Sequence, residues 1–492
     1  MVRLASLPEM KGSSSGAPTG VFFRRALLAF LMLGALGLGA LSWPYTVDDA
    51  FVVGRYAARL ASGDGYTFVE GPPTDGITGP PFVLVGVLGA SAGLDPVDVA
   101  KGFGLVCAVL AIAILHRAAR RRVVGNLSAH VACAFLTLAP SYLTWSVAGL
   151  ETGAAALACI LLAESVLLTP RPWSAGLWAA LLVGLRPECI PLSAALISYL
   201  VRRRRKHSWP AVAFPMFALV GVATFRYALF GTIDPLSLAA KPADLAHGAQ
   251  YAFRVLTYGT ALTSLPLVVL AARGSRRMRV LGVALIVHVL AIVLAGGDWM
   301  PGVRLFVPAL PLLSWMVGVG AADLVRRRAS PKALPVAITG LLIAPALLFA
   351  FETYRAREAG AAREHGGREL IAALERADVH RVALIDIGFI TYQSEMTPID
   401  LGGITDPSIG RLPGAHLDKP ITGAMLIDRH PDAIVLHSAT EPRIDDTGHL
   451  TALGGFPLER RLAMDENIRS AFRADEVIDY AEGYYYVILT RR

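Results

Sequence analysis

Long runs of apolar residues, separated by short polar connectors, occupy the chain from about residue 21 to residue 351. A helix needs roughly 20 apolar residues to cross a bilayer, so this pattern predicts membrane-spanning helices, several of them short. The run at 80–95 begins with Pro80-Pro81 and is interpreted as a re-entrant or interfacial segment. The remaining runs predict eleven spans, at about 23–43, 98–117, 127–146, 148–168, 173–186, 188–201, 209–230, 259–272, 279–296, 303–323 and 332–351.

Clusters of positive charge mark several connectors, most clearly Arg202 to Lys206 and Arg326 to Arg328. Because Lys and Arg are retained in cytoplasmic loops, the spans place the N-terminus inside and the chain after residue 351 outside. Residues 1–20 are rich in Ser, Gly and Pro and are predicted to form a disordered cytoplasmic tail. Arg24-Arg25 precedes an apolar run as in a signal peptide, but no A-x-A-like site follows, so we expect a retained first helix.

The pattern after residue 351 is that of a soluble domain. An amphipathic stretch at 355–377 is followed by strand-like runs at 381–386, 433–436 and 484–489, which predicts a small α/β domain over 352–492. The predicted architecture is therefore an α-helical integral membrane bundle over 21–351, with a first outer loop at 44–79, and an extracytoplasmic α/β domain. No glycine-rich phosphate loop follows the strands, which argues against nucleotide binding.

Composition supports a membrane protein and argues against nucleic-acid binding. The chain is 54% hydrophobic and 17% charged, with a mean hydropathy of +0.53, whereas soluble domains contain about 25% charged residues. The net charge of +8 resides largely in the predicted cytoplasmic connectors, where it sets topology. The four cysteines lie in apolar segments without metal-ligand spacing, so we expect them to be packing residues.

The first outer loop begins with two adjacent carboxylates, Asp48 and Asp49. Such a pair is costly at a bilayer edge, because each group resists desolvation and each raises the proton affinity of the other. A helix cap for the segment starting near Ala50 is the alternative. The pair is the leading candidate for catalysis.

Other polar residues gather on the same predicted outer side. Glu151 and Asp298 could be helix caps, Arg186 and Glu188 a mutual ion pair, and Lys241 a solvated loop residue. Trp299 fits an interfacial anchor better than a substrate platform. The candidates on this face are Arg55, Glu70, Asp75, Glu151, Arg186, Glu188, Lys241, Asp298, Trp299 and Arg304.

This combination fits sugar transfer from a polyprenyl-phosphate donor whose tail remains in the bilayer. A carboxylate acting as general base contributes typically 10²–10⁴-fold, and cations stabilise the departing phosphate. Asp48 is predicted to be the base, with Asp49 as its partner. The donor phosphate would be held by Arg186, Lys241, Arg304 and Arg55, and the pocket would be organised by Glu70, Asp75, Glu151, Glu188, Asp298 and Trp299.

No cofactor is required by the sequence. Asp48 or Asp49 could bridge a divalent metal ion to the phosphate, but no spacing demands one. The predicted partners are membrane lipids, the lipid-linked sugar donor and a glycan or glycoconjugate acceptor.

Several motifs, in order along the chain, resemble the GT-C membrane glycosyltransferases, and among them the mycobacterial terminal β-(1→2)-arabinofuranosyltransferase family. Asp48-Asp49-Ala50-Phe51 with Arg55-Tyr56-Ala57 is similar to its DDAY/F…RYA signature. The other matching segments are Gly149-Leu150-Glu151-Thr152, Arg186-Pro187-Glu188, Ala240-Lys241, Gly296-Gly297-Asp298-Trp299-Met300-Pro301-Gly302 with Arg304, Ile385-Asp386-Ile387-Gly388 and Asp400-Leu401-Gly402-Gly403-Ile404-Thr405-Asp406.

The resemblance implies a bacterial plasma-membrane enzyme with its active site on the periplasmic or extracellular side. It also implies an inverting displacement, with decaprenylphosphoryl-arabinofuranose as the expected donor type. The chain departs from the family pattern around Glu70 and at Thr232, which bears on the sugar and acceptor more than on the reaction class.

Three alternatives remain open at the level of sequence. A GT-C transferase of mannosyl or aminoarabinose type would use another sugar. A transporter or flippase of lipid-linked sugars would place polar residues across both leaflets and often contain a repeat, and neither feature is seen in the sequence. A non-catalytic scaffold of envelope assembly would not need the acidic pair.

Overall fold

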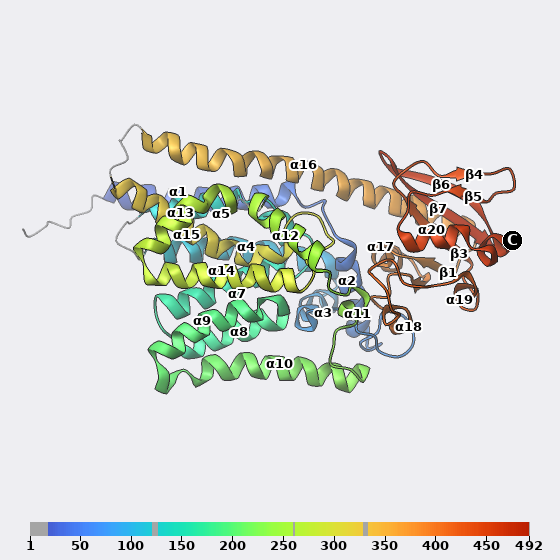
Figure 1. The fold of residues 1–492 in the computed structure, drawn as a ribbon, viewed down its shortest axis with the longest axis horizontal. Coiled ribbons are helices and arrows are strands. Elements are labelled where there is room, and N and C mark those ends of the chain that lie inside the picture. Colours follow the sequence, from blue (N-terminus) through green and yellow to red (C-terminus); the bar gives the residue numbers. More distant parts are fainter. Residues whose placement is uncertain (1–17, 121–125, 259–260, 328–332, 492) are drawn as a thin grey trace, which may run out of the picture.

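The structure is a computed structural model that describes residues 18–120, 126–258, 261–327 and 333–491. A bundle of roughly aligned helices forms one end of the molecule and a sheet domain forms the other (Figure 1). Of the predicted N-terminal tail, residues 1–17 lie outside the described residues. The chain therefore enters the described structure at the first helix.

Each of the eleven predicted spans overlaps one helix of the bundle. These helices are α1 (Pro18–Leu41), α4 (Pro96–Arg120), α5 (Asn126–Thr137), α7 (Thr152–Leu167), α8 (Pro172–Leu185), α9 (Ile190–Arg203), α10 (Trp209–Phe230), α13 (Ala261–Gly274), α14 (Arg276–Leu294), α15 (Leu310–Arg326) and α16 (Ala333–Arg376). The predicted span 127–146 is interrupted, because the chain turns at Pro140 and Ser141 between α5 and α6 (Tyr142–Ser146).

Within the described residues, four segments are long and apolar enough to cross a membrane: α4, α10, α14 and residues 304–326. The bent pair of α12 (Leu245–Thr257) and α13 would make a fifth. Several shorter apolar helices accompany them, including α7 and α8. The fold is thus that of a largely helical membrane protein, and the count of eleven spans stays a prediction.

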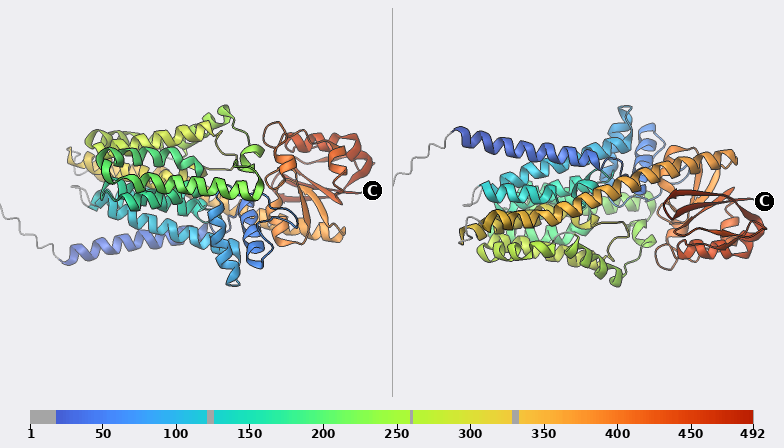
Figure 2. Two further views of the ribbon diagram at one scale, coloured as in Figure 1. Left: turned by 90° about the horizontal axis from the view of Figure 1, so that it is seen from below. Right: turned by 90° about the horizontal axis from the view of Figure 1, so that it is seen from above.

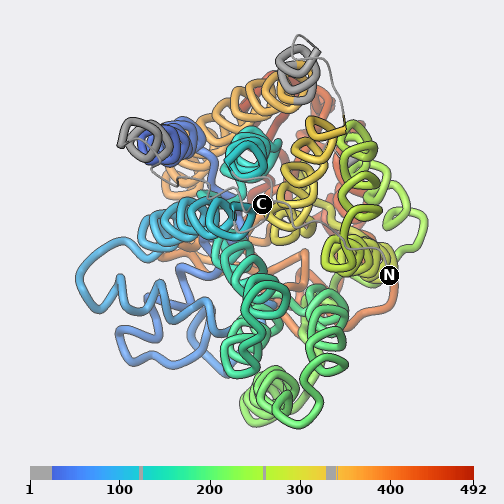
Figure 3. Tube along the Cα trace, turned by 90° about the vertical axis from the view of Figure 1, so that its left-hand side faces the viewer, coloured from blue at the N-terminus to red at the C-terminus, as the bar shows by residue number. Residues whose placement is uncertain are grey.

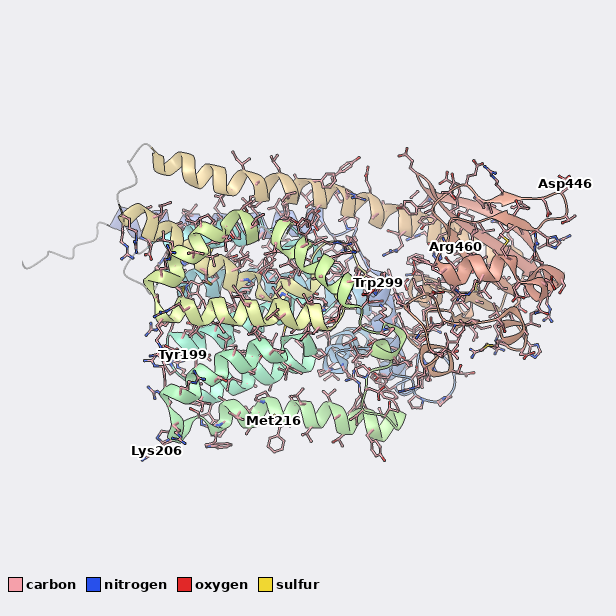
Figure 4. The ribbon with its side chains drawn as sticks, in the orientation of Figure 1. Tyr199, Lys206, Met216, Trp299, Asp446 and Arg460 are labelled. Carbon is pink, nitrogen blue, oxygen red and sulfur yellow. The ribbon has the colours of Figure 1, made fainter. Side chains whose placement is uncertain are left out.

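Burial varies strongly among the apolar helices. The window around α15 is 94% buried, whereas that of α10 is only 6% buried. Viewed end-on in Figure 3, α10 occupies the rim of the bundle. Met216 and Phe217 of α10 are 53% and 76% exposed, and Figure 4 labels Met216 on this outlying helix. An apolar face of this kind suits contact with lipid.

Two short helices lie across the end of the bundle that is next to the sheet domain (Figure 2). They are α2 (Asp48–Ser62) and α3 (Val83–Ser91). Helix α3 follows the 3₁₀ turn Pro80–Phe82 and has nine residues, which is too short to cross a bilayer. The interfacial interpretation of 80–95 stays a prediction.

Helix α16 connects the two parts of the molecule. It is 44 residues long and runs along the bundle to the sheet domain (Figure 1). The last predicted span and the amphipathic stretch at 355–377 are therefore one continuous helix. Its final turns pack against the sheet, where Leu370 and Leu374 are buried.

The C-terminal domain contains a five-stranded sheet in the order β2-β1-β3-β7-β6. Strand β1 is parallel to β2 and β3, and β7 is antiparallel to β3 and β6. The bounds are β1 Arg381–Leu384, β2 Thr397–Asp400, β3 Ala433–Ser438, β6 Phe472–Ala481 and β7 Tyr484–Arg491, with β4 Arg443–Ile444 and β5 Leu450–Ala452 in a second sheet. Strands β1, β3 and β7 coincide with the strand-like runs, whereas β2 and β6 were not predicted.

Short elements complete the fold. They are the 3₁₀ turns Pro187–Cys189, Arg205–His207 and Arg304–Ala309 (η2, η3 and η4) and the helices α11 (Leu236–Ala240), α17 (Ile387–Gln393), α18 (Pro407–Gly410), α19 (Gly423–Ile427), α20 (Pro457–Met464) and α21 (Glu466–Ala471).

Candidate active site

Asp48 and Asp49 occupy the first turn of α2 and point to different partners. The Asp48 carboxylate accepts hydrogen bonds from the backbone N–H groups of Gly388 and Phe389, at 2.8 and 2.9 Å. These groups belong to the first turn of α17, so Asp48 links the first outer loop to the C-terminal domain. Both oxygens of the predicted base are therefore engaged in a contact between domains.

Asp48 is also electrostatically distinct from its neighbour. Burial and the nearby carboxylate of Asp386 raise the pKa of Asp48 to about 7, against the opposing effect of Arg363 and the two N–H donors. A pKa near neutrality suits a general base, but a base must first reach the proton that it takes. Asp48 has the required pKa, but both of its oxygens already accept backbone hydrogen bonds.

Asp49 faces a group of cations at the end of the bundle. Its Oδ2 lies 3.5 Å from NH1 of Arg304, and its side chain is 30% exposed. Although burial raises the pKa of Asp49, the positive charges of Lys241 and Arg304 lower it below its ordinary value. Asp49 is therefore an ionised, partly exposed carboxylate that lies next to Arg304 and is subject to the positive charge of Lys241.

Arg304 is held in place by Asp298. Its Nε donates to Asp298 Oδ2 at 2.8 Å and its NH2 donates to Asp298 Oδ1 at 3.0 Å. Two parallel hydrogen bonds of this kind fix the guanidinium plane. The third nitrogen, NH1, does not bind Asp298 and points toward Asp49.

The turn before Arg304 needs its two glycines. Gly296 and Gly297 have φ values of 90° and 75°, which L side chains rarely adopt. A Cβ at Gly296 would lie 2.6 Å from the backbone nitrogen of Asp244, so the turn can pack closely against the start of α12. This packing explains the Gly296-Gly297-Asp298-Trp299 motif.

Lys241 follows α11 and is positioned by the C-terminal domain. Lys419, which is 2% exposed, donates from Nζ to the carbonyls of Ala239, Leu412 and Gly414 at 3.0, 2.7 and 3.3 Å. Its bond to Ala239 fixes the residues just before Lys241. The ammonium group of Lys241 makes no ion pair with a described residue, so it is available for an anion.

Arg186 is enclosed by acidic groups. Its Nε lies 2.7 Å from Glu151 Oε1 and its NH1 lies 3.2 Å from Glu188 Oε1. Its NH2 donates to Thr152 Oγ1 at 2.9 Å. The Arg186 side chain is only 5% exposed, so little of its charge is available to a ligand. Its contacts hold the start of α7 and the turn between α8 and α9 together.

Three candidates of the first outer loop lie apart from this group. Arg55 donates to the carbonyl of Phe68 at 3.4 Å, and Glu70 is exposed. Asp75 is buried and paired with Arg226 of α10, at 2.9 Å. Arg226 also donates to the carbonyls of Ile77 and Thr78, so this pair ties the loop to α10.

The site contains no evident metal-ligand set. Across the described ranges, no group of three or more His, Cys, Asp or Glu side chains is arranged to hold a metal ion. Asp48 and Asp49, the candidate ligands, engage α17 and Arg304 respectively. The acidic pair is thus split between two tasks and does not form a shared ligand set.

Several residues near the site carry no local sequence signal. His288 of α14 lies between the carbonyls of Glu188 and Leu305, at 3.2 and 3.0 Å. Tyr251 of α12 accepts the N–H of Leu305 at 2.9 Å. They brace the segment that carries Arg304, and only the packing of separate helices reveals them.

Comparison with solved structures identifies the fold. The oligosaccharyltransferase AglB from Archaeoglobus fulgidus, in complex with an inhibitory peptide and a dolichol-phosphate, matches with a TM-score of 0.52 and 13% identity, over 85% of this chain and 70% of that chain. ArnT from Cupriavidus metallidurans, bound to undecaprenyl phosphate, matches with a TM-score of 0.52 and 14% identity, over 80% and 77%.

The chain therefore has the fold of the GT-C glycosyltransferases, which are integral membrane proteins. The arabinofuranosyltransferase AftD from mycobacteria matches with a TM-score of 0.48 and 15% identity, over 94% of this chain and 40% of that chain. Residues 357–488 match a family described as a domain of unknown function, DUF8728. No curated protein matches the sequence.

Proposed function

We propose that this protein is a membrane glycosyltransferase that moves a sugar from a polyprenyl-phosphate donor to a glycan or glycoconjugate acceptor. The observation that carries the proposal is the group formed by Asp49, Arg304 and Lys241, in which an ionised carboxylate stands beside two cations. This is the combination that proton removal and phosphate departure require.

In the proposed reaction, Lys241 and Arg304 bind the donor phosphate and Asp49 accepts the proton of the acceptor hydroxyl. The acceptor oxygen forms a bond to the anomeric carbon while the bond from that carbon to the phosphate oxygen breaks. The polyprenyl phosphate leaves with the electron pair, and attack from the opposite face inverts the configuration.

Donor binding would also change the pKa of Asp49. A bound phosphate offsets the positive charges that lower the pKa of Asp49, so the carboxylate becomes more basic when the donor is in place. Arg186, Glu151 and Glu188 would support the site from behind.

We place the reaction on the outer side of a bacterial plasma membrane, with the N-terminus in the cytoplasm. Lys206 marks a strongly basic connector at the end of the bundle opposite Trp299 (Figure 4). Basic connectors are cytoplasmic in multi-span proteins, which supports an external site. The sequence motifs support arabinofuranose as the sugar, while the fold accommodates other lipid-linked donors.

Asp49→Asn tests the proposal directly. Purified protein is incubated with radiolabelled polyprenyl-phosphate sugars, including decaprenylphosphoryl-arabinofuranose, in the absence of any nucleotide sugar. The wild type should form product, and Asp49→Asn should lower kcat by about 10²–10⁴-fold.

Asp64→Asn is the matched control, because Asp64 lies in the same loop and is 50% exposed. It should retain activity. Product formation by Asp49→Asn at the wild-type rate would exclude Asp49 as the base, and a flippase would move the lipid without forming product.

A further inference from the structure

Three aromatic rings from distant segments meet beside the proposed site. The indole of Trp299 stacks on the imidazole of His247, with ring centroids 4.2 Å apart and an interplanar angle of 12°. His416 of the C-terminal domain approaches the same indole at 5.5 Å and 51°. Figure 4 shows Trp299 where the helical bundle meets the C-terminal domain. We call these three residues the aromatic platform.

Hydrogen bonds fix the residues that carry two of the rings of the aromatic platform. His247 Nδ1 lies 2.7 Å from the carbonyl of Gly296, and Asp244 caps the helix that carries His247. Asp298, the residue before Trp299, is held by its two hydrogen bonds with Arg304. Trp299 is thus fixed between two constrained elements, as a binding surface should be.

The aromatic platform is partly exposed to solvent. Trp299 remains 51% exposed, although His247 covers one face of its ring. About half of the Trp299 side chain is therefore left uncovered between His247 and His416. A half-exposed indole that is backed by a second ring suits a flat, partly apolar ligand such as a sugar ring.

The His416 ring, whose centroid lies 5.5 Å from that of the indole, carries a polar atom without a partner. Its Nδ1 is buried and has no hydrogen-bond partner among the described residues. Burial, together with the charge of Lys241, lowers the pKa of His416 to about 4, so the ring is neutral at physiological pH. A neutral imidazole suits a hydroxyl group better than a phosphate, which the nearby Lys241 can bind.

We infer that the aromatic platform binds a sugar ring of the acceptor glycan, which stacks on Trp299 while His416 Nδ1 hydrogen-bonds to one of its hydroxyl groups. This inference rests on the proposed function and assigns its acceptor side to a neutral glycan. The C-terminal domain thereby contributes directly to acceptor binding, since His416 belongs to it.

The position agrees with the proposed reaction. Asp298 precedes Trp299 and binds Arg304, which in turn contacts Asp49. The charges of Asp49 and Lys241 both act on His416. A sugar on Trp299 would therefore lie beside the base and next to the cations that hold the donor phosphate.

The test measures acceptor and donor binding separately, with the full chain in detergent. Two soluble probes, a synthetic arabinofuranosyl pentasaccharide and a mannosyl pentasaccharide, are titrated by calorimetry, and undecaprenyl phosphate is the donor-side probe. The wild type should bind one of the glycans. Trp299→Ala should weaken that binding about tenfold, and His416→Ala should weaken it less.

Three further variants make the result specific. Trp173→Ala removes a tryptophan that is 60% exposed at the start of α8 and should leave glycan binding unchanged. His416→Gln retains a hydrogen-bonding group and should recover part of the loss. Lys241→Ala should weaken undecaprenyl phosphate binding, whereas Trp299→Ala and His416→Ala should not.

Unchanged glycan affinity in both Trp299→Ala and His416→Ala would overturn the inference and leave Trp299 as a membrane anchor. Failure of the wild type to bind either glycan, or binding of an Asn- and Ser-containing peptide to the platform instead, would also overturn it. If the wild type did not bind undecaprenyl phosphate, the proposed function itself would be contradicted. The two failures are therefore distinguishable.

Discussion

At the scale of single residues, adjacent carboxylates in one helical turn acquire opposite properties. Asp48 turns to the backbone of α17, where burial and Asp386 raise its pKa to about 7. Asp49 turns to Arg304 and Lys241, which hold its pKa below the ordinary value. Side chains one position apart on a helix point about 100° away from each other, so they can meet different surroundings.

This difference predicts the pH dependence of transfer. An acid with a lowered pKa stays ionised to lower pH, so kcat/KM should fall only below the ordinary Asp value of about 4. Lys241→Ala removes one cation and should move this acidic limb to higher pH. The measurement is kcat/KM against pH for the wild type and the variant.

Lys206→Ala is the control, because Lys206 lies at the far end of the bundle (Figure 4). It should leave the profile unchanged. If kcat/KM of Lys241→Ala fell at the same acidic pH as that of the wild type, Lys241 would not lower the pKa of Asp49.

At the scale of elements, the first outer loop and α17 are fitted to each other. A Cβ on Gly388 would lie 2.2 Å from the backbone oxygen of Asp48, which is too close for any side chain. Phe51 of α2 also contacts Phe389 edge to face, with centroids 5.1 Å apart. The start of α2 is thus shaped by the C-terminal domain, and Asp49 is oriented as a consequence.

Gly388→Ala should therefore separate α17 from α2. We expect a lower melting temperature, faster proteolysis between the bundle and the C-terminal domain, and reduced transfer. Limited proteolysis and thermal unfolding of the detergent-solubilised protein provide the measurement.

Gly102→Ala in α4 is the matched substitution, because a Cβ there would meet no atom within 4 Å. It should be neutral or slightly stabilising, since alanine favours helix. Equal behaviour of the two variants would argue against the tight contact at Gly388.

At the scale of the whole molecule, the C-terminal domain contains a group of charged side chains close to the contact between α2 and α17. His437 of β3 has Nδ1 2.8 Å from Glu459 Oε1 and Nε2 3.7 Å from Asp386 Oδ2. Burial alone would lower the pKa of His437, but the charges of Glu459 and Asp386 outweigh it and raise the pKa to about 9. The protonated histidine links the sheet to the segment that leads into α17.

A raised pKa in the folded state makes stability depend on pH. The contribution of His437 is complete below pH 6.5, its ordinary pKa, and is lost as the pH rises through about 9. The shift corresponds to about 3 kcal/mol, so the melting temperature should fall between these pH values.

His437→Gln should flatten this dependence, whereas His380→Gln, at a side chain 84% exposed, should not. The measurement is the melting temperature from pH 6 to 10 for all three proteins. A wild-type profile that stays flat would contradict the assigned charge of His437.

Much of the candidate site could be anticipated from local motifs. Asp49, Asp298 and Arg304 are brought together, and Arg186 is paired with Glu151 and Glu188, as residues on one predicted face can be. Arg55 and Glu70 lie elsewhere because a loop that doubles back sends its polar side chains in several directions. Proximity in sequence does not encode that path.

The sequence alone allowed eleven helical segments of the bundle and three of the sheet strands to be predicted, because hydrophobic length and periodicity reflect burial segment by segment. It did not predict α12 or the break between α5 and α6. Three features became apparent from the folded molecule alone: Asp49 faces the cations, α16 continues unbroken into the second domain, and His416 lies beside Trp299. These outcomes depend on contacts between segments up to hundreds of residues apart, and such contacts leave no periodic trace in the chain.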